Sequence, residues 1–199
     1  MTESTKSILI FGDLMVDTFL YGDVSRISPE APVPVLKPNH RFHYLGGAAN
    51  VARNTSALAA RTSIVGVCGD DENASVMQEE FERQDIDSTA ICRLPQQRTI
   101  HKMRLVGNDQ QLIRIDWHDS YAVDDEIEKM LLASIDEVLS DQDIVIISDY
   151  GKGTCSQFLC QQIIKKSQSL GIPVIVDPKG KDWSKYSGAT IITPNLKEI

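Results

Sequence analysis

Short apolar runs that alternate with helical segments in the last third of the chain constrain its fold most strongly. The runs DIVIISD (143–149), IPVIVDPKG (172–180) and ATIITPN (189–195) contain few polar residues until their ends. The stretches 124–140 and 154–171, between and before them, have helical periodicity. Continuous apolar strands that alternate with helices form a mostly parallel sheet with helices on both faces. We therefore predict an α/β fold.

The first half of the chain shows the same alternation. The runs SILIFGD (7–13) and RTSIVGVCGDD (61–71) predict two further buried strands. Residues 46–60 and 72–84 have helical spacing, and Val51, Thr55 and Leu58 are expected to share one face of the first of these helices. The predicted sheet therefore takes strands from both ends of the sequence.

Two segments depart from this pattern and predict a second, smaller sheet. Residues 20–45 carry four prolines within ten positions, so PVPVLK (32–37) and HRFHYL (40–45) are expected to be short exposed strands. Residues 98–119 contain two alternating runs around Gly107-Asn108-Asp109, which is typical of a hairpin. We expect the two segments to pair with each other.

Composition excludes several classes of protein. The formal charge of −8 argues against a general nucleic-acid binder. No apolar run is long enough to cross a bilayer, and the N-terminus lacks a secretory pattern, so we predict a cytoplasmic protein without a membrane partner. The four cysteines show no C-x-x-C spacing, which favours free buried thiols over a zinc site.

Polar residues gather where the predicted strands end. They are Asp13, Asp70, Ser148, Asp149, Asp177 and Asn195. Ligands bind beyond the carboxyl ends of parallel strands, so these residues predict a ligand crevice. Aspartate is also a common helix cap and turn residue, and this alternative remains open for each aspartate alone.

The sequence YLGGAAN (44–50) combines very small side chains with one amide. Gly46 and Gly47 are expected to open a helix and to let a ligand approach the backbone, whose first N–H groups lack helical partners. Asn50 offers both a donor and an acceptor, as a polyhydroxy ligand requires. Close packing of the helix on a strand is the alternative explanation for the glycines.

Six motifs in order resemble the ribokinase-like, or phosphofructokinase-B, family of sugar kinases. They are SRISPEAPVPV, LGGAANVARN, DQQLIRID, SDYGKG, DPKG and TPNLKEI. Within the family the chain is most similar to the kinase part of the bifunctional heptose 7-phosphate kinase / heptose 1-phosphate adenylyltransferases. The resemblance implies transfer of the ATP γ-phosphate, with Mg²⁺, to the C1 hydroxyl of D-glycero-D-manno-heptose 7-phosphate for the lipopolysaccharide core.

The resemblance also implies roles for individual residues. Sugar contacts are expected from Asp13, Asp17, Gly46, Gly47, Asn50, Ser148 and Asp149, and contacts with the existing phosphate from Lys102 and Arg104. Nucleotide contacts are expected from Lys179, Asn195 and Glu198, with Glu198 indirectly near magnesium. The segments near 20–45 and 98–119 would form a lid over the sugar and join two copies into a homodimer.

One family motif is missing. The kinases place their catalytic aspartate in a Gly-Ala-Gly-Asp sequence, which this chain does not contain. We therefore assign no catalytic residue, and we expect residues 1–199 to be the N-terminal part of a kinase domain. Alone it should be inactive and poorly soluble or self-associating. The alternatives are a sugar-phosphate-binding fragment or truncated gene product without catalysis and, from Gly151-x-Gly153, a dinucleotide-dependent oxidoreductase.

Overall fold

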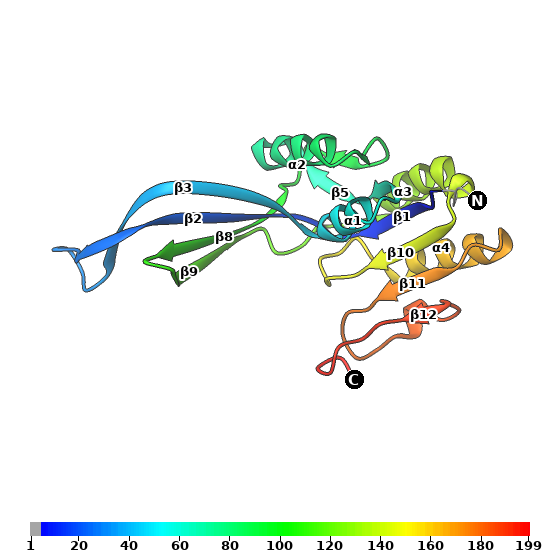
Figure 1. Cartoon of the computed structure of the whole chain (residues 1–199). Helices are drawn as coiled ribbons and strands as arrows, with labels where there is room; N and C mark the ends of the chain where they lie inside the picture. The colour runs from blue at the N-terminus through cyan, green and yellow to red at the C-terminus, as the bar shows by residue number, and fades with distance from the viewer. Residues whose placement is uncertain (1–4) are drawn as a thin grey trace.

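A computed structural model describes residues 5–199 and shows a six-stranded parallel sheet at the centre of the protein (Figure 1). The strand order is β12-β11-β10-β1-β4-β6, so the N-terminal strand lies in the middle. The strands are β1 Ser7–Gly12, β4 Arg61–Val65, β6 Ile86–Asp87, β10 Ile144–Ser148, β11 Val174–Asp177 and β12 Ile191–Ile192. All neighbouring pairs are parallel, which confirms the predicted α/β fold.

Helices cover both faces of this sheet. They are α1 Ala48–Ala57, α2 Glu72–Arg83, α3 Asp125–Val138 and α4 Gln157–Ser169, with short 3-10 turns at Leu139–Asp141 and Ser184–Tyr186. Alternate residues of β1 enter two separate cores, because successive strand side chains point to opposite faces. Leu9 and Phe11 join the core under α3 and α4, whereas Ile10 joins the core under α1 and α2.

A four-stranded sheet projects from the main body as a long arm (Figure 1). Its order is β3-β2-β8-β9, formed by β2 Leu14–Ile27, β3 Pro34–Gly47, β8 Ile100–Gly107 and β9 Gln110–Trp117. The predicted second sheet is therefore confirmed, but the hairpin does not pair with the proline-rich strand β3 as expected. It pairs with β2, which lies between them and was not predicted. The two predicted short strands are in fact one long edge strand, β3. Pro38 lies beside a register shift in this strand, where the regular hydrogen-bond pattern is interrupted and a residue without an N–H is tolerated.

Two other local predictions are wrong. Residues 61–71 form two strands, because the chain turns at Gly66 and β5 Val67–Gly69 pairs instead with β7 Cys92–Leu94. The helix predicted at 46–60 starts at Ala48, and Leu58 is 83% exposed. Its buried face is formed by Ala48, Ala49, Ala52 and Thr55. These small side chains allow α1 to lie close to the sheet. The prediction from the spacing of Val51, Thr55 and Leu58 missed this face, because it followed the larger residues.

The four cysteines are free thiols with buried side chains, as predicted. No helix in the part of the chain that the structure describes is long and apolar enough to cross a membrane. The final residues form a turn in which the backbone N–H of Glu198 donates to the carbonyl of Asn195 at 3.0 Å.

Candidate functional site

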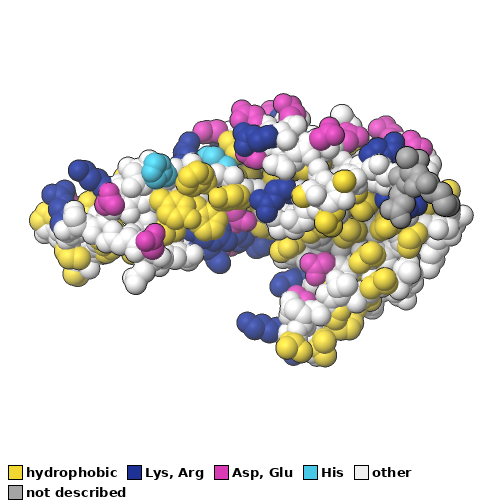
Figure 2. Space-filling model, viewed as in Figure 1, with side chains coloured by type: hydrophobic (Ala, Val, Ile, Leu, Met, Phe, Trp, Pro, Cys, Tyr) yellow, Lys and Arg dark blue, Asp and Glu magenta, His cyan; other side chains and the backbone are white. Residues whose placement is uncertain are grey.

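A cavity of about 620 Å³ lies where the arm joins α1. Six residues predicted to bind substrate line it: Asp17, Gly46, Gly47, Asn50, Lys102 and Arg104. The space-filling view shows Lys and Arg side chains on the underside of the arm, beside a hollow between the arm and the main body (Figure 2). Residues from β2, β3, β8 and α1, far apart in sequence, are thereby brought to one place.

Pleating of β2 decides which of its side chains face the cavity. Asp17, Phe19 and Tyr21 lie on the cavity side, because alternate residues of a strand share a face. Thr18, between them, is fully buried and hydrogen-bonds to His43 and His101. Asp17 is therefore the one acidic side chain that β2 contributes to the cavity.

Asp17 is held in place by a neighbouring cation. The Nη1 of Arg104 donates to Oδ1 of Asp17 at 2.5 Å, and both side chains are about one-fifth exposed. The Arg104 guanidinium also lies 5.0 Å from the centroid of the Phe19 ring, in a cation–π arrangement. One oxygen of Asp17 is used in this way, and the other, Oδ2, lies beside Gly46.

Gly46 and Gly47 are required to be glycine for different structural reasons. A Cβ at Gly46 would lie 2.5 Å from Oδ2 of Asp17, so glycine leaves room for that carboxylate. Gly47 has a φ of 59°, and a Cβ there would lie 2.3 Å from the carbonyl oxygen of Asp13. That carbonyl accepts the N–H of Ala48 at 2.9 Å. Gly46 therefore allows the backbone to lie against the Asp17 side chain beside the cavity, and Gly47 allows it to lie against the Asp13 backbone behind the cavity.

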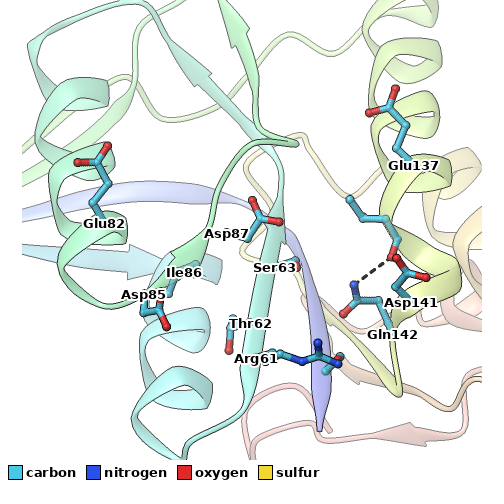
Figure 3. Close-up of a pocket in the computed structure, with 12 residues that line it drawn as sticks. Arg61, Thr62, Ser63, Glu82, Asp85, Ile86, Asp87, Glu137, Asp141 and Gln142 are labelled. Carbon is cyan, nitrogen blue, oxygen red and sulfur yellow. Dashed lines mark hydrogen bonds between the residues drawn. The ribbon is translucent and has the colours of Figure 1, made fainter. Parts of the chain in front are cut away.

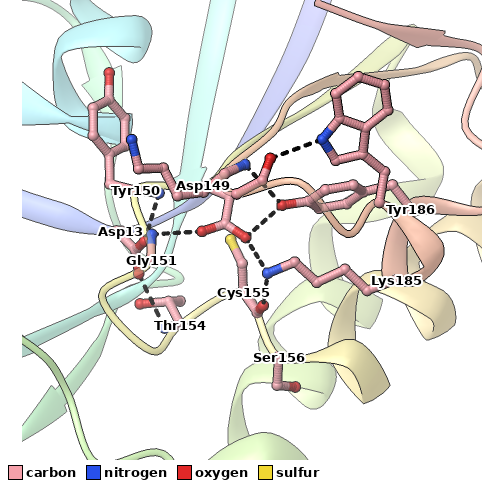
Figure 4. A network of polar contacts seen from close by, with 12 residues as sticks. Asp13, Asp149, Tyr150, Gly151, Thr154, Cys155, Ser156, Lys185 and Tyr186 are labelled. Carbon is pink, nitrogen blue, oxygen red and sulfur yellow. Dashed lines mark hydrogen bonds and ion pairs between the residues drawn. The ribbon is translucent and has the colours of Figure 1, made fainter. Parts of the chain in front are cut away.

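Asp13 is fully buried and does not line the cavity (Figure 4). Its carboxylate accepts the backbone N–H groups of Tyr150, Lys152 and Thr154 at 2.8 to 3.0 Å. The loop after β10 is thus folded around this acid, and the same loop places Tyr150 at the cavity wall. Asp13 shapes the site through that loop, whereas a direct sugar contact stays a prediction.

Ser148 and Asp149 also lie outside the cavity. Asp149 has a 1% exposed side chain that pairs with the Lys185 ammonium, accepts the Tyr186 hydroxyl at 2.7 Å and accepts the Gly151 N–H at 2.6 Å (Figure 4). Burial lowers the pKa of Lys185, but the hydrogen bond and charge of Asp149 outweigh it and raise the pKa overall. Ser148 is fully buried at the end of β10. These internal contacts satisfy the hydrogen-bonding capacity of the buried Asp149 carboxylate, so its presence needs no ligand to explain it.

The three residues predicted to bind nucleotide lie near the last two strands. Lys179 Nζ is 3.5 Å from Oε1 of Glu198, and the Asn195 N–H donates to Oε2 of Glu198 at 3.0 Å. These contacts, with that N–H the largest contributor, lower the pKa of Glu198. Burial, followed by the charge of Glu198, raises the pKa of Asp177. The charges of Asp177 and Glu198 therefore influence each other, and the Lys179 ammonium lies beside Glu198.

A larger cavity of about 890 Å³ lies near the amino end of β4, between α2 and α3 (Figure 3). Its wall includes Arg61, Glu82, Asp87 and Glu137, together with Gln142, whose amide donates to the Val138 carbonyl at 2.9 Å. No residue predicted to bind a ligand lies there. Ligands of open α/β sheets bind at the carboxyl ends of the strands, so the smaller cavity is the better candidate.

Sequence reasoning missed several residues of the cavity wall, among them Arg53, Arg114 and Tyr150. Arg53 follows Asn50 by three positions on α1, so its place on the same face could have been inferred. Arg114 lies opposite Arg104 in the hairpin register. Tyr150 had no comparable signal, because its position depends on the buried contact between its loop and Asp13.

Known proteins resemble this chain in sequence over nearly its whole length. The profile of the pfkB family carbohydrate kinases matches residues 5–199. Bifunctional protein HldE of Magnetococcus marinus is 42% identical over 98% of this chain, and that of Methylobacillus flagellatus is 45% identical over 96%. The chain covers 40% and 39% of these two proteins, so it spans about two-fifths of their length.

Solved structures show the same fold at low identity. A structure titled as a putative phosphofructokinase from Staphylococcus aureus gives a TM-score of 0.75 at 17% identity and covers 98% of this chain and 60% of its own. Arabidopsis thaliana ribokinase complexed with ribose and ATP gives 0.67 at 17% identity, with 98% and 62% covered. These likenesses establish the ribokinase-like arrangement of the two sheets.

Proposed function

The chain belongs to the pfkB family of carbohydrate kinases, and we propose that it forms the sugar-binding part of a heptose 7-phosphate kinase. The reaction would transfer the γ-phosphate of ATP to the C1 hydroxyl of D-glycero-D-manno-heptose 7-phosphate, in the cytoplasm, for the lipopolysaccharide core. Similarity to two HldE proteins over nearly the whole chain supports this choice of sugar.

The observation that carries the proposal is the mixed character of the cavity under the arm. Asp17 and Asn50 supply acceptors and a donor for sugar hydroxyls, and Gly46 leaves space beside them. Lys102 and Arg104 give the same cavity positive charge, as a phosphorylated sugar requires. A neutral ligand would explain the hydroxyl partners but not the cations.

Nucleotide binding is proposed at the edge formed by β11 and β12. Lys179 and Asn195 would contact ATP phosphates, and Glu198 would act with Asp177 near Mg²⁺, since carboxylate oxygens suit this ion. Magnesium bound there would neutralise charge on the transferring phosphate. Burial and then the charge of Glu198 raise the pKa of Asp177, and a cation bound beside it would favour the ionised carboxylate.

The catalytic base is not assigned, because the sequence contains no Gly-Ala-Gly-Asp. The second candidate function is a sugar-phosphate-binding protein without turnover. The dinucleotide alternative has no support in the geometry: the N–H of Gly151 is used by Asp149, and the loop around it is folded onto Asp13. The family match and this internal use of the loop both favour the sugar kinase.

A homodimer through the arm is part of the proposal. Several large apolar side chains on the arm are exposed, namely Ile27, Val33, Phe42, Tyr44, Ile113 and Trp117. Burial of such surface against a second copy would be favourable. Light scattering of the purified chain tests this, and a monomer at micromolar concentration would contradict it.

Calorimetric titration of the purified chain with D-glycero-D-manno-heptose 7-phosphate tests the substrate. We expect saturable binding to the wild type and at least tenfold weaker binding to Asp17→Asn, because a hydrogen bond to a charged group is lost. Absence of binding by the wild type would overturn the proposal. Release of ADP in a parallel assay would contradict the second candidate, since the binding protein would show affinity without turnover.

A further inference from the structure

The charges around the cavity are not balanced. Four cationic side chains line it, namely Arg53, Lys102, Arg104 and Arg114. Asp17 is the one acid on the wall, and Asp116 lies beside it as the ion-pair partner of two of the cations. Four positive and two negative charges leave an excess of two positive charges before any ligand binds.

Three of the four cations are already paired. Arg104 contacts Asp17 at 2.5 Å, and Lys102 contacts Asp116 at 3.2 Å. Arg114 uses Nε and Nη2 to contact both oxygens of Asp116, at 2.8 and 3.0 Å. These pairs use the carboxylates near the cavity, so a phosphate bound by any of these cations must compete with an internal partner.

Arg53 differs from the other three. None of the ion pairs formed among residues 5–199 includes it, although its side chain is partly buried in the cavity wall. A guanidinium in a cavity wall that has no carboxylate partner is available to pair with an anionic ligand. It lies three residues after Asn50 on α1, so both side chains project from one face of the helix.

We propose that Arg53 is the specificity-determining residue that binds the phosphate group of the sugar substrate, an inference that rests on the proposed function. The planar guanidinium donates two parallel hydrogen bonds to phosphate oxygens, which a lysine at this site would not reproduce. Lys102 and Arg104 then act mainly through Asp116 and Asp17, and Arg53 distinguishes a phosphorylated sugar from a free one. This assignment differs from the sequence-based one, which gave the phosphate to Lys102 and Arg104.

The test compares two ligands on two proteins. Binding of D-glycero-D-manno-heptose 7-phosphate and of the same heptose without phosphate is measured by calorimetry for wild type and Arg53→Gln. We expect the variant to lose at least tenfold in affinity for the phosphorylated sugar, because charge-assisted hydrogen bonds are removed. Its affinity for the free heptose should stay within about twofold, since the hydroxyl partners are unchanged.

Two further variants guard against indirect effects. Arg83→Gln removes the same charge from an exposed site on α2, where Arg83 pairs with Glu80, and should leave both affinities unchanged. Arg53→Lys keeps the charge and should recover only part of the phosphate preference. Thermal unfolding of each variant confirms that the fold is intact.

The outcomes separate this inference from the proposed function. A wild type that prefers the phosphorylated heptose, with the preference unchanged in Arg53→Gln, overturns the role of Arg53 and leaves the substrate in place. A wild type that binds neither heptose overturns the substrate and the inference with it. Equal losses for both ligands in Arg53→Gln also overturn the inference, since they indicate a general distortion of the cavity.

Discussion

Asp17 and Asp13 are four positions apart, yet they belong to two regions with opposite properties. Asp17 lies in the cavity under the arm, about one-fifth exposed, with one cation beside it. Asp13 lies in the buried network after β1 and β10, with no exposure and three backbone N–H groups on its carboxylate. The cavity keeps polar atoms available for a ligand, whereas the network uses them to hold loops.

The difference shows that an acid at a strand end has two possible uses. A buried carboxylate is stable only when protein donors replace water, and Asp13 and Asp149 have such donors. Asp17 has a single strong partner and remains in contact with solvent. The number of internal donors therefore separates the structural acids Asp13 and Asp149 from Asp17, the acid proposed to bind a ligand.

The largest expected effect is on the stability of the network. Asp149→Ala should lower the free energy of unfolding by about 3 kcal/mol, because the Lys185 ammonium and the Tyr186 hydroxyl lose their shared acceptor. Urea unfolding followed by circular dichroism measures this change. As a control, Asp136→Ala breaks an exposed pair with Lys166 and should cost at most about 1 kcal/mol. Equal small losses in both variants would remove the distinction between the regions.

The next effect concerns the cavity. Asp17→Asn should weaken binding of the phosphorylated heptose by about 10- to 100-fold, while the free energy of unfolding changes by less than about 1 kcal/mol. Calorimetric titration and urea unfolding of the same preparation give both numbers. Unchanged affinity, or a stability loss as large as that of Asp149→Ala, would place Asp17 with the structural acids.

Gly46 and Gly47 allow the same comparison at adjacent positions, because Gly46 contacts Asp17 of the cavity and Gly47 contacts Asp13 of the network. Gly47→Ala should destabilise the fold by about 2 kcal/mol, because alanine is strained at a φ of 59° and its Cβ meets the Asp13 backbone. Gly46→Ala should instead weaken sugar binding by about tenfold, because its Cβ displaces the Asp17 carboxylate. Each variant is assayed for both stability and affinity. A reversed assignment of the two effects would break the proposed boundary between the regions.

The smallest expected effect is the pH dependence of the network. The folded pKa of Lys185 is raised, so its stabilising contribution is fully present below the ordinary lysine pKa of about 10.4 and is lost as pH rises through the folded value. The decrease in the free energy of unfolding from pH 9 to a pH above 11 should therefore be larger for wild type than for Lys185→Gln. Parallel pH profiles for the two proteins would contradict the pairing with Asp149.

Much of the main sheet was predictable, whereas the arm was predicted only in part. The apolar runs that form β1, β10 and β11 can be recognised as strands from the sequence, because strands buried on both faces have few polar positions. The run that became β2 mixes Asp17, Thr18 and Gly22 with aromatic residues, and its pairing on both edges gives it strand structure. Local pattern does not report such long-range pairing.

The candidate site followed the same division. The glycines, Asn50 and Asp17 were found from motif and helix geometry, and the structure brings them to one cavity. Arg53 was missed although its spacing after Asn50 places it on the same helix face, because its importance depends on which neighbouring cations are already paired. Tyr150 was missed because its place depends on a loop fixed by a buried acid. Burial and partner counts are properties of the assembled protein.

The sequence alone determined the alternation of strands and helices, the family, and the small residues at the start of α1, since periodicity and motifs are local. Only the tertiary structure decided which acids face the cavity and which lie within the network. The reason is that hydrogen-bond donors and ion-pair partners come from segments up to 141 positions away, as for Asp13 and Thr154. The availability of a carboxylate to a ligand is set by those distant partners.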